Sequence, residues 1–190
     1  MPVEGYDAFD DPYSYMGTTI LKNKLGLRAP ELLESFELEM TALRANEPLP
    51  DGKYDALHYR RIHRHFFQDV YNWAGKYRTV RTSKGGNPFC FPEYITSSMD
   101  RLFAALRDSQ RLKIEGAEST ATFLAELNAI HPFREGNGRS QLAFIDLLGE
   151  KAGFPFDFSR VERETFLPAM IASYDGNLKP MVDELKKLLA

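Results

Sequence analysis

The sequence predicts an all-α domain that carries one small β-hairpin. Apolar residues recur at three- and four-residue steps through most of the chain, as they do in amphipathic helices. One stretch, residues 77–91, instead combines strand-favouring residues with a dense cluster of turn residues. Two apolar segments flank a glycine-rich loop at 132–137, so we expect a helical bundle around a central helix–loop–helix.

The composition indicates a packed globular protein and excludes several classes. The chain has 190 residues, of which 43% are apolar, enough for one domain with a sizeable core. A net charge of −3 gives no overall basic surface for nucleic acid. Cys90 is the single cysteine, so an intramolecular disulfide is impossible and a reducing cytoplasm is expected. No apolar run approaches the ~18 residues of a membrane span, and no signal-peptide pattern is present.

The first half of the chain is expected to form an arm and two long helices. Residues 1–15, acidic and aromatic, are interpreted as an extended arm on a single domain that spans residues 16–190. A short helix is predicted at 18–25. Pro30 suits the first position of the longer helix that is predicted next. The apolar stripe of that helix consists of Leu33, Phe36, Met40 and Leu43.

After a break at 46–52, a helix is predicted from near Asp55 to Ala74. Its buried stripe consists of Tyr59, Ile62, Phe66, Val70 and Trp73. His63 lies one position off this stripe, as structural histidines often do, and it is left without a role. Later helices are predicted over residues 93–109, 117–131, 139–152, from a capping box at 159–162 onward, and over 178–189.

The nine residues from His131 to Arg139 combine residue types that suit phosphate chemistry. His131 titrates near neutral pH, so it can accept a proton from a hydroxyl. Glu135 is an oxygen ligand suited to Mg²⁺. The glycines are expected to adopt positive φ and to form an anion-binding nest at a helix N-terminus. The nest would consist of the backbone N–H groups of Gly136, Asn137 and Gly138.

This stretch resembles the signature of Fic proteins, His-x-Phe-x-[Asp/Glu]-Gly-Asn-Gly-Arg-x-x-Arg. The residues from His131 to Arg139 match every specified position, whereas Leu142 replaces the final arginine. The similarity covers most of residues 15–190. Upstream it is carried by residues 62–64, 69–75 and 78–80, which are Ile-His-Arg, Asp-Val-Tyr-Asn-Trp-Ala-Gly and Arg-Thr-Val.

The resemblance implies a Fic fold and an enzyme that transfers AMP from ATP to a hydroxyl of a target protein, with Mg²⁺ as cofactor. His131 would be the base, Glu135 the metal ligand and Phe133 a core anchor. The nest would hold the α- and β-phosphates, with Arg139 also contacting phosphate. The hairpin would be a flap that docks the target by strand addition. Its residues are Ser83, Lys84, Gly85, Gly86, Asn87 and Pro88.

Leu142 leaves two further functions open. In the family the missing arginine reaches toward the γ-phosphate, and leucine supplies no charge. The chain is therefore either an active transferase, a non-catalytic nucleotide- or protein-binding module that keeps the loop, or a relative that uses another phosphate-containing donor.

The resemblance also implies a mode of regulation. Fic proteins are commonly restrained by a helix bearing [Ser/Thr]-x-x-x-Glu-[Gly/Asn]. Ser35 to Glu39 and Thr122 to Glu126 have the spacing, but Met40 and Leu127 follow them. We therefore expect a separate small antitoxin that supplies the glutamate. The chain would be a toxin acting on type II DNA topoisomerase subunits, in the bacterial cytoplasm or delivered into a target cell.

Overall fold

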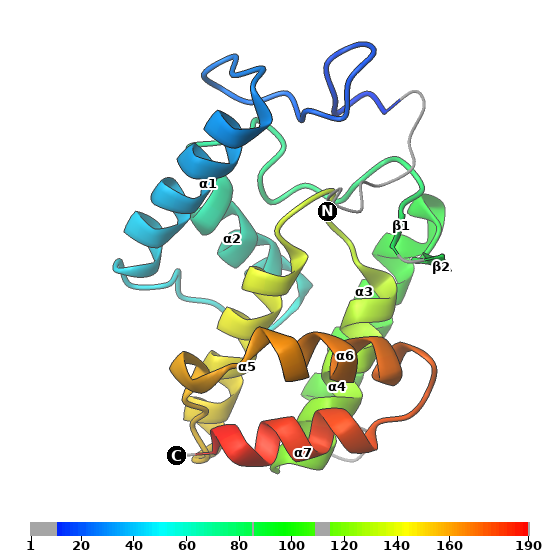
Figure 1. The fold of residues 1–190 in the computed structure, drawn as a ribbon. Coiled ribbons are helices and arrows are strands. Elements are labelled where there is room, and N and C mark those ends of the chain that lie inside the picture. Colours follow the sequence, from blue (N-terminus) through cyan, green and yellow to red (C-terminus); the bar gives the residue numbers. More distant parts are fainter. Residues whose placement is uncertain (1–10, 85, 109–114, 190) are drawn as a thin grey trace.

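The computed structural model describes residues 11–84, 86–108 and 115–189 (Figure 1). In these residues, seven α-helices and one antiparallel hairpin form the domain, as the sequence predicted. The helices are α1 (Pro30–Ala45), α2 (Ala56–Phe67), α3 (Pro92–Arg107), α4 (Ala117–Ile130), α5 (Asn137–Ala152), α6 (Arg163–Tyr174) and α7 (Lys179–Leu188). The hairpin pairs β1 (Ser83–Lys84) with β2 (Asn87–Pro88), and a short 3-10 helix, η1 (Phe158–Arg160), precedes α6.

The core lies where α4 meets its neighbours. α4 packs against α3, α5, α6 and α7, while α2 packs against both α1 and α5. Figure 1 shows α6 and α7 side by side across α4, at the end of the molecule away from α1. Five aromatic rings, each 1% exposed or less, fill the centre: Tyr59, Phe103, Phe123, Phe133 and Phe144. Phe133 is thus the core anchor that the motif implied. None of the helices described is long and apolar enough to span a bilayer.

The helix predicted at 18–25 is absent, because side chains there bind the backbone instead. The segment forms turns and one isolated bridge between Ser14 and Leu21. The Thr18 hydroxyl donates to Tyr15 O and accepts from Ile20 N. The Asn23 amide likewise donates to the carbonyls of Leu21 and Leu27 and accepts from Leu27 N. Such local bonds compete with the helical ladder, and here they replace it.

The helix predicted to reach Ala74 ends at Phe67, seven residues earlier. The backbone N–H groups of Val70 and Tyr71 both donate to Phe67 O, at 3.1 and 2.9 Å, and the chain then continues in turns. The Tyr71 and Trp73 rings then stack at 4.3 Å. The predicted apolar stripe is nevertheless buried throughout, because the turns return Val70 and Trp73 to the core.

Three other local predictions were wrong in whole or in part. Residues 77–80 form no strand, and the hairpin is confined to β1 and β2; Gly85, a predicted flap residue, lies outside the described residues. The capping box at 159–162 does not form, because Asp157 accepts from Ser159 N and caps η1 instead, and α6 begins at Arg163. The stripe predicted for α1 is buried at Leu33 and exposed at Leu43.

The segment before α1 is joined to the loop between α4 and α5 by a buried ion pair. Arg134 Nε donates to Asp11 Oδ2 at 2.6 Å, and the two side chains are 5% and 1% exposed. Asp11 also accepts from the backbone N–H of Tyr13 and the hydroxyl of Ser14. Tyr13 in turn packs edge-on against Trp73 and bonds Thr79 N. The N-terminal segment therefore belongs to the fold from Asp11 onward, whereas residues 1–10 of the predicted arm lie outside the described residues.

We expect Asp11→Ala to lower the free energy of unfolding by about 3–5 kcal/mol, because it removes one partner of a buried ion pair. Urea unfolding followed by far-UV circular dichroism measures the change. Asp183→Ala is the matched control, since it breaks an ion pair with Lys179 whose side chains are 49% and 79% exposed and should leave stability nearly unchanged. Equal stability of the two variants would contradict the prediction.

Candidate active site

The predicted loop links α4 to α5 and is held in shape from within. α4 ends at Ile130, and His131 adopts the left-handed region at φ 47°, ψ 62°. The Asn137 side chain then bridges the loop, because its Oδ1 accepts from Phe133 N at 3.0 Å and its Nδ2 donates to Phe133 O at 2.8 Å. The helix–loop–helix is therefore confirmed, with α5 starting two residues earlier than predicted.

The His131 imidazole is buried and packed against an aromatic ring. It is 8% exposed and stacks on the Phe89 ring at 3.8 Å with an interplanar angle of 7°. Burial, together with the charges of Arg78 and Lys84, lowers the pKa of His131 to about 3. The ring is therefore neutral at pH 7, as a general base must be, and the surroundings disfavour its protonated form.

Glu135 lies half-buried at the start of α5, where its Oε1 accepts from Gly136 N at 2.9 Å. Removal from water and the nearby Glu37 carboxylate raise the pKa of Glu135. A cation at this position would relieve both effects. In the described residues no three His, Cys, Asp or Glu side chains cluster into a metal site. The single carboxylate fits Mg²⁺ only if phosphate oxygens supply further ligands, which is how Mg²⁺ is usually bound beside nucleotides.

His63 fixes the backbone of Glu135. Its Nδ1 accepts from Gly75 N at 2.9 Å, so its Nε2 carries the proton and donates to Glu135 O at 2.9 Å. The ring stacks between Phe133 and Phe67, and burial lowers its pKa to about 3. The sequence assigned no role to His63. Its position next to a buried stripe was the only sign that it has a structural one.

The two glycines of the loop differ. Gly136 has φ +80°, and a Cβ built there would lie 2.2 Å from the Phe67 ring, so only glycine fits. Gly138 is helical, contrary to the expected positive φ, and a Cβ there would meet nothing within 4 Å. Gly138 is also exposed, so the first turn of α5 is open to a ligand such as phosphate.

Arg139 is turned toward α1. Its guanidinium forms an ion pair with Glu37, donates to Thr41 Oγ1 at 3.2 Å and lies 4.6 Å from the Phe67 ring centroid. The Tyr71 hydroxyl donates to the same Glu37 carboxylate. Glu37 thus supplies negative charge next to a cation that sits unfavourably at a helix N-terminus.

Glu37 was not among the predicted site residues, although the sequence contains one sign of its role. Leu33, Glu37 and Thr41 are spaced four residues apart, so they share one face of α1, and both Leu33 and Thr41 are buried. A carboxylate on a core-facing position needs a partner. Leu142 is half-buried and packs against the core one turn after Arg139, so it adds no cation.

The hairpin lies next to the loop, as expected for a flap. Phe89, which stacks on His131, directly follows β2, and its N–H donates to Thr82 O at 3.1 Å. The Tyr174 hydroxyl of α6 donates to Pro88 O and ties β2 to the helical body. Among the predicted flap residues, Lys84, Gly86 and Pro88 are exposed, while Ser83 and Asn87 are half-buried.

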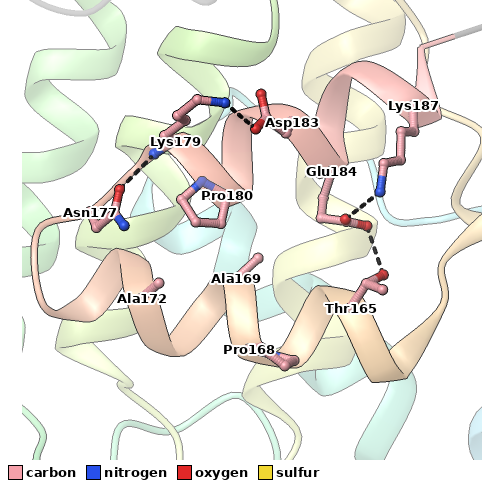
Figure 2. A pocket seen from close by; sticks show the side chains of 10 residues that line it. All are labelled: Thr165, Pro168, Ala169, Ala172, Asn177, Lys179, Pro180, Asp183, Glu184 and Lys187. Atoms are coloured by element: carbon pink, nitrogen blue, oxygen red, sulfur yellow. Dashed lines mark hydrogen bonds and ion pairs between the residues drawn. The ribbon is translucent and has the colours of Figure 1, made fainter.

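A separate groove of about 610 Å³ runs between α6 and α7 (Figure 2). Two ion pairs, Lys179–Asp183 and Lys187–Glu184, lie along it. None of its lining residues belongs to the loop, to the start of α5 or to the hairpin. The groove is therefore not part of the candidate active site.

Comparison with known proteins agrees with this geometry. The model of the Fic/DOC family matches residues 53–148. The probable protein adenylyltransferase y4lH of Sinorhizobium fredii is 48% identical over 97% of this chain and 98% of its own length. The protein adenylyltransferase VbhT of Bartonella schoenbuchensis is 37% identical over 90% of this chain, which spans 37% of that protein. The crystal structure of the Bartonella tribocorum effector BepC with bound AMPPNP superimposes with a TM-score of 0.82, 31% identity and coverage of 94% and 96%.

Replacing each loop glycine with alanine should separate the effect on stability from the effect on nucleotide binding. Gly136→Ala should destabilise the protein by roughly 2 kcal/mol or more, because the new methyl collides with Phe67 at a positive φ. Gly138→Ala should keep full stability, since alanine suits a helix, yet weaken nucleotide binding by narrowing the open turn. Thermal unfolding and calorimetry with ATP measure the two effects. Unchanged ATP affinity in Gly138→Ala would remove the first turn of α5 from the phosphate site.

The two buried histidines predict how stability depends on pH. His63 and His131 have a pKa of about 3 in the folded protein, below the ~6.5 of an unfolded chain. Between these values the unfolded chain binds more protons, so stability is full above pH ~6.5 and falls as the pH is lowered. From about pH 6 to 5 the two histidines together should contribute a slope that approaches 2.7 kcal/mol per pH unit, about 1.36 for each.

Urea unfolding at several pH values tests this, and His131→Asn should lower the slope by about 1.36 kcal/mol per pH unit. Asparagine tolerates the left-handed backbone of position 131, so the variant should still fold. An equal slope in the wild type and His131→Asn would contradict the buried neutral state of the His131 ring.

Proposed function

This chain belongs to the Fic/DOC family, and we propose that it is a protein adenylyltransferase that moves AMP from ATP to a hydroxyl side chain of a target protein. One observation carries the proposal: the loop is intact, with a neutral His131 at its entrance and Glu135 beside the open N-terminus of α5. Relatives that align along nearly the whole chain are named protein adenylyltransferases, and the solved relative BepC holds AMPPNP.

The chain's own residues account for the reaction as follows. A target serine, threonine or tyrosine is docked at the hairpin, with its hydroxyl next to His131. His131 accepts the hydroxyl proton as the oxygen forms a bond to the α-phosphorus, and the bond to the leaving pyrophosphate breaks. Because the pKa of His131 is low, proton transfer must come late, when the attacking oxygen has become strongly acidic.

The phosphates are held at the start of α5. The N–H groups at 136–138 and the helix dipole favour their charge, and the uncrowded Gly138 admits them. Glu135 would hold Mg²⁺ beside the bound phosphates, and the ion would supply positive charge against the charge of the leaving pyrophosphate. Arg139 reaches phosphate only by giving up its pair with Glu37.

Target recognition is assigned to the hairpin. β1 and β2 have two residues each, and their register pairs Ser83 with Pro88 and Lys84 with Asn87. An extended target segment that adds to one edge would form main-chain bonds there. Because Phe89 connects β2 to the stack on His131, a segment held at this edge lies close to the base.

A toxin restrained by a small antitoxin is the biological setting that we propose, with type II DNA topoisomerase subunits as the first targets to examine. It would act in the bacterial cytoplasm or after delivery into another cell. The chain's own Glu39 and Glu126 are exposed, and it is Glu37 that contacts Arg139. An antitoxin glutamate would therefore have to displace Glu37 from Arg139, or the antitoxin would block the site sterically.

A second candidate is favoured by Leu142. Leu142 is half-buried against the core, and Arg139 is shared with Glu37, so the γ-phosphate has little positive charge to bind. This arrangement suits another phosphate-containing donor, or a module that binds nucleotide or protein without turnover.

Labelling of a bacterial lysate discriminates among these functions. Purified protein is incubated with lysate, Mg²⁺ and ATP labelled in the α-phosphate, and with the other labelled nucleotides in parallel. We expect a labelled protein band with ATP, and His131→Asn should reduce the labelling rate by about 10²–10⁴. His65→Asn, a histidine of α2 that bonds Arg44 O, is the matched control and should label normally.

Each alternative predicts a different outcome. Label from another nucleotide alone would favour a different donor, and no label from any nucleotide would favour the binding module. Equal labelling by wild type and His131→Asn would remove His131 from the role of base. Mass spectrometry of the labelled band identifies the target and the modified residue.

A further inference from the structure

Arg78 joins the base of the hairpin to the end of α4. Its side chain is 2% exposed. Nε donates to His131 O at 2.8 Å, and Nη2 donates to Ile130 O at 3.2 Å and to Cys90 O at 2.5 Å. Nη1 donates to Val80 O at 2.6 Å. One guanidinium therefore binds main-chain carbonyls on both sides of the active site.

At α4, Arg78 satisfies groups that a helix end leaves open. The last carbonyls of a helix have no partner within it and carry partial negative charge, which a cation stabilises. Here Ile130 O and His131 O receive the guanidinium, while the Arg78 N–H donates to Pro132 O at 2.9 Å. The backbone that presents the His131 ring is thereby fixed in its left-handed conformation, which is uncommon for a residue other than glycine.

At the hairpin, the Arg78 side chain binds both the segment that precedes β1 and the segment that follows β2. Val80 precedes β1 and Cys90 follows β2, so their carbonyls mark the entry and exit of the flap. The Cys90 N–H also donates to Ala129 O at 3.1 Å. The ring of Phe89, the residue before Cys90, stacks on the His131 ring. A hairpin with two residues per strand is too short to be stable alone, so its position depends on the contacts of the segments that precede β1 and follow β2.

We propose that Arg78 is a positioning residue that fixes the distance between the hairpin and the His131 ring. It thereby also fixes the distance from a docked target hydroxyl to the base. This role rests on the proposed function, because it concerns the same flap and the same histidine. The requirement is for arginine rather than for positive charge alone. Only a planar fork with five N–H donors reaches four carbonyls at once, whereas a lysine ammonium has three donors at a single point.

Hydrogen–deuterium exchange of the free protein tests the clamp without any activity. The variants are Arg78→Lys, which keeps the charge, and Arg78→Met, which keeps the chain length. Arg60→Met is the matched control. Arg60 bonds only Gly75 O among the described carbonyls and lies over the Tyr77 ring, away from the hairpin.

We expect the amides of Phe89 and Cys90 to exchange roughly tenfold faster in Arg78→Lys, and faster still in Arg78→Met if that variant folds. The amides of α5 and the Arg60→Met control should keep the wild-type rates. Wild-type exchange at Phe89 and Cys90 in Arg78→Lys would overturn the proposal. Faster exchange spread evenly over α4 and α5 would overturn it as well, because that would show a purely structural role.

Kinetics with the protein that the wild-type enzyme labels provide the second test. Arg78→Lys should raise the KM for the target and lower kcat about tenfold or more, because misplacing the hydroxyl weakens both docking and attack. The dissociation constant for ATP, measured by calorimetry, should not change, since the carbonyls that Arg78 binds belong to residues 80, 90, 130 and 131 and not to the start of α5. Normal target kinetics, or a loss confined to ATP binding, would contradict the proposal. If the wild-type protein labels nothing, the proposed function fails, and the exchange data still decide whether Arg78 holds the flap.

Discussion

The constraint on which the structure depends is that an irregular loop is buried in the core. Residues 131–134 are all buried, yet a loop has no ladder of its own to satisfy its backbone polar groups. Side chains from elsewhere supply the bonds. Asn137 closes the loop on Phe133, Arg78 binds the carbonyl of His131, and His63 binds that of Glu135. Removing any one of them leaves buried polar groups unsatisfied, so the loop has one well-defined conformation.

The same bonds determine the chemistry of the site. Burial that fixes the loop also removes His131 and Glu135 from water, and it shifts both groups toward their neutral forms by lowering the pKa of His131 and raising that of Glu135. A neutral imidazole has the free lone pair that a general base needs, although burial makes it a weaker base, and a carboxylate that is costly to ionise gains from a nearby cation. In the function that we propose, a nucleotide with its metal ion would supply the charges that complete the site.

Charge around the start of α5 is shared among few groups. Arg139 is paired with Glu37, and Leu142 adds no second cation, so the pocket offers the terminal phosphate less charge than the family signature would. By contrast, the backbone N–H groups and the space beside Gly138 are intact. The region that would hold the α- and β-phosphates therefore offers more favourable contacts than the region that would hold the γ-phosphate, so the site depends mainly on the two inner phosphates of its donor.

The sequence by itself determined the all-α architecture, the hairpin, the loop between α4 and α5 and the residues offered for chemistry, because those depend on local spacing and turn chemistry. It failed where local rules compete: Asn23 and Thr18 bind nearby backbone instead of allowing a helix, and the turns after Phe67 end α2 early. Only the tertiary structure decided the roles of Asp11, Glu37, His63 and Arg78. Their partners lie 123, 102, 72 and 53 residues away along the chain, and no local pattern specifies such a contact.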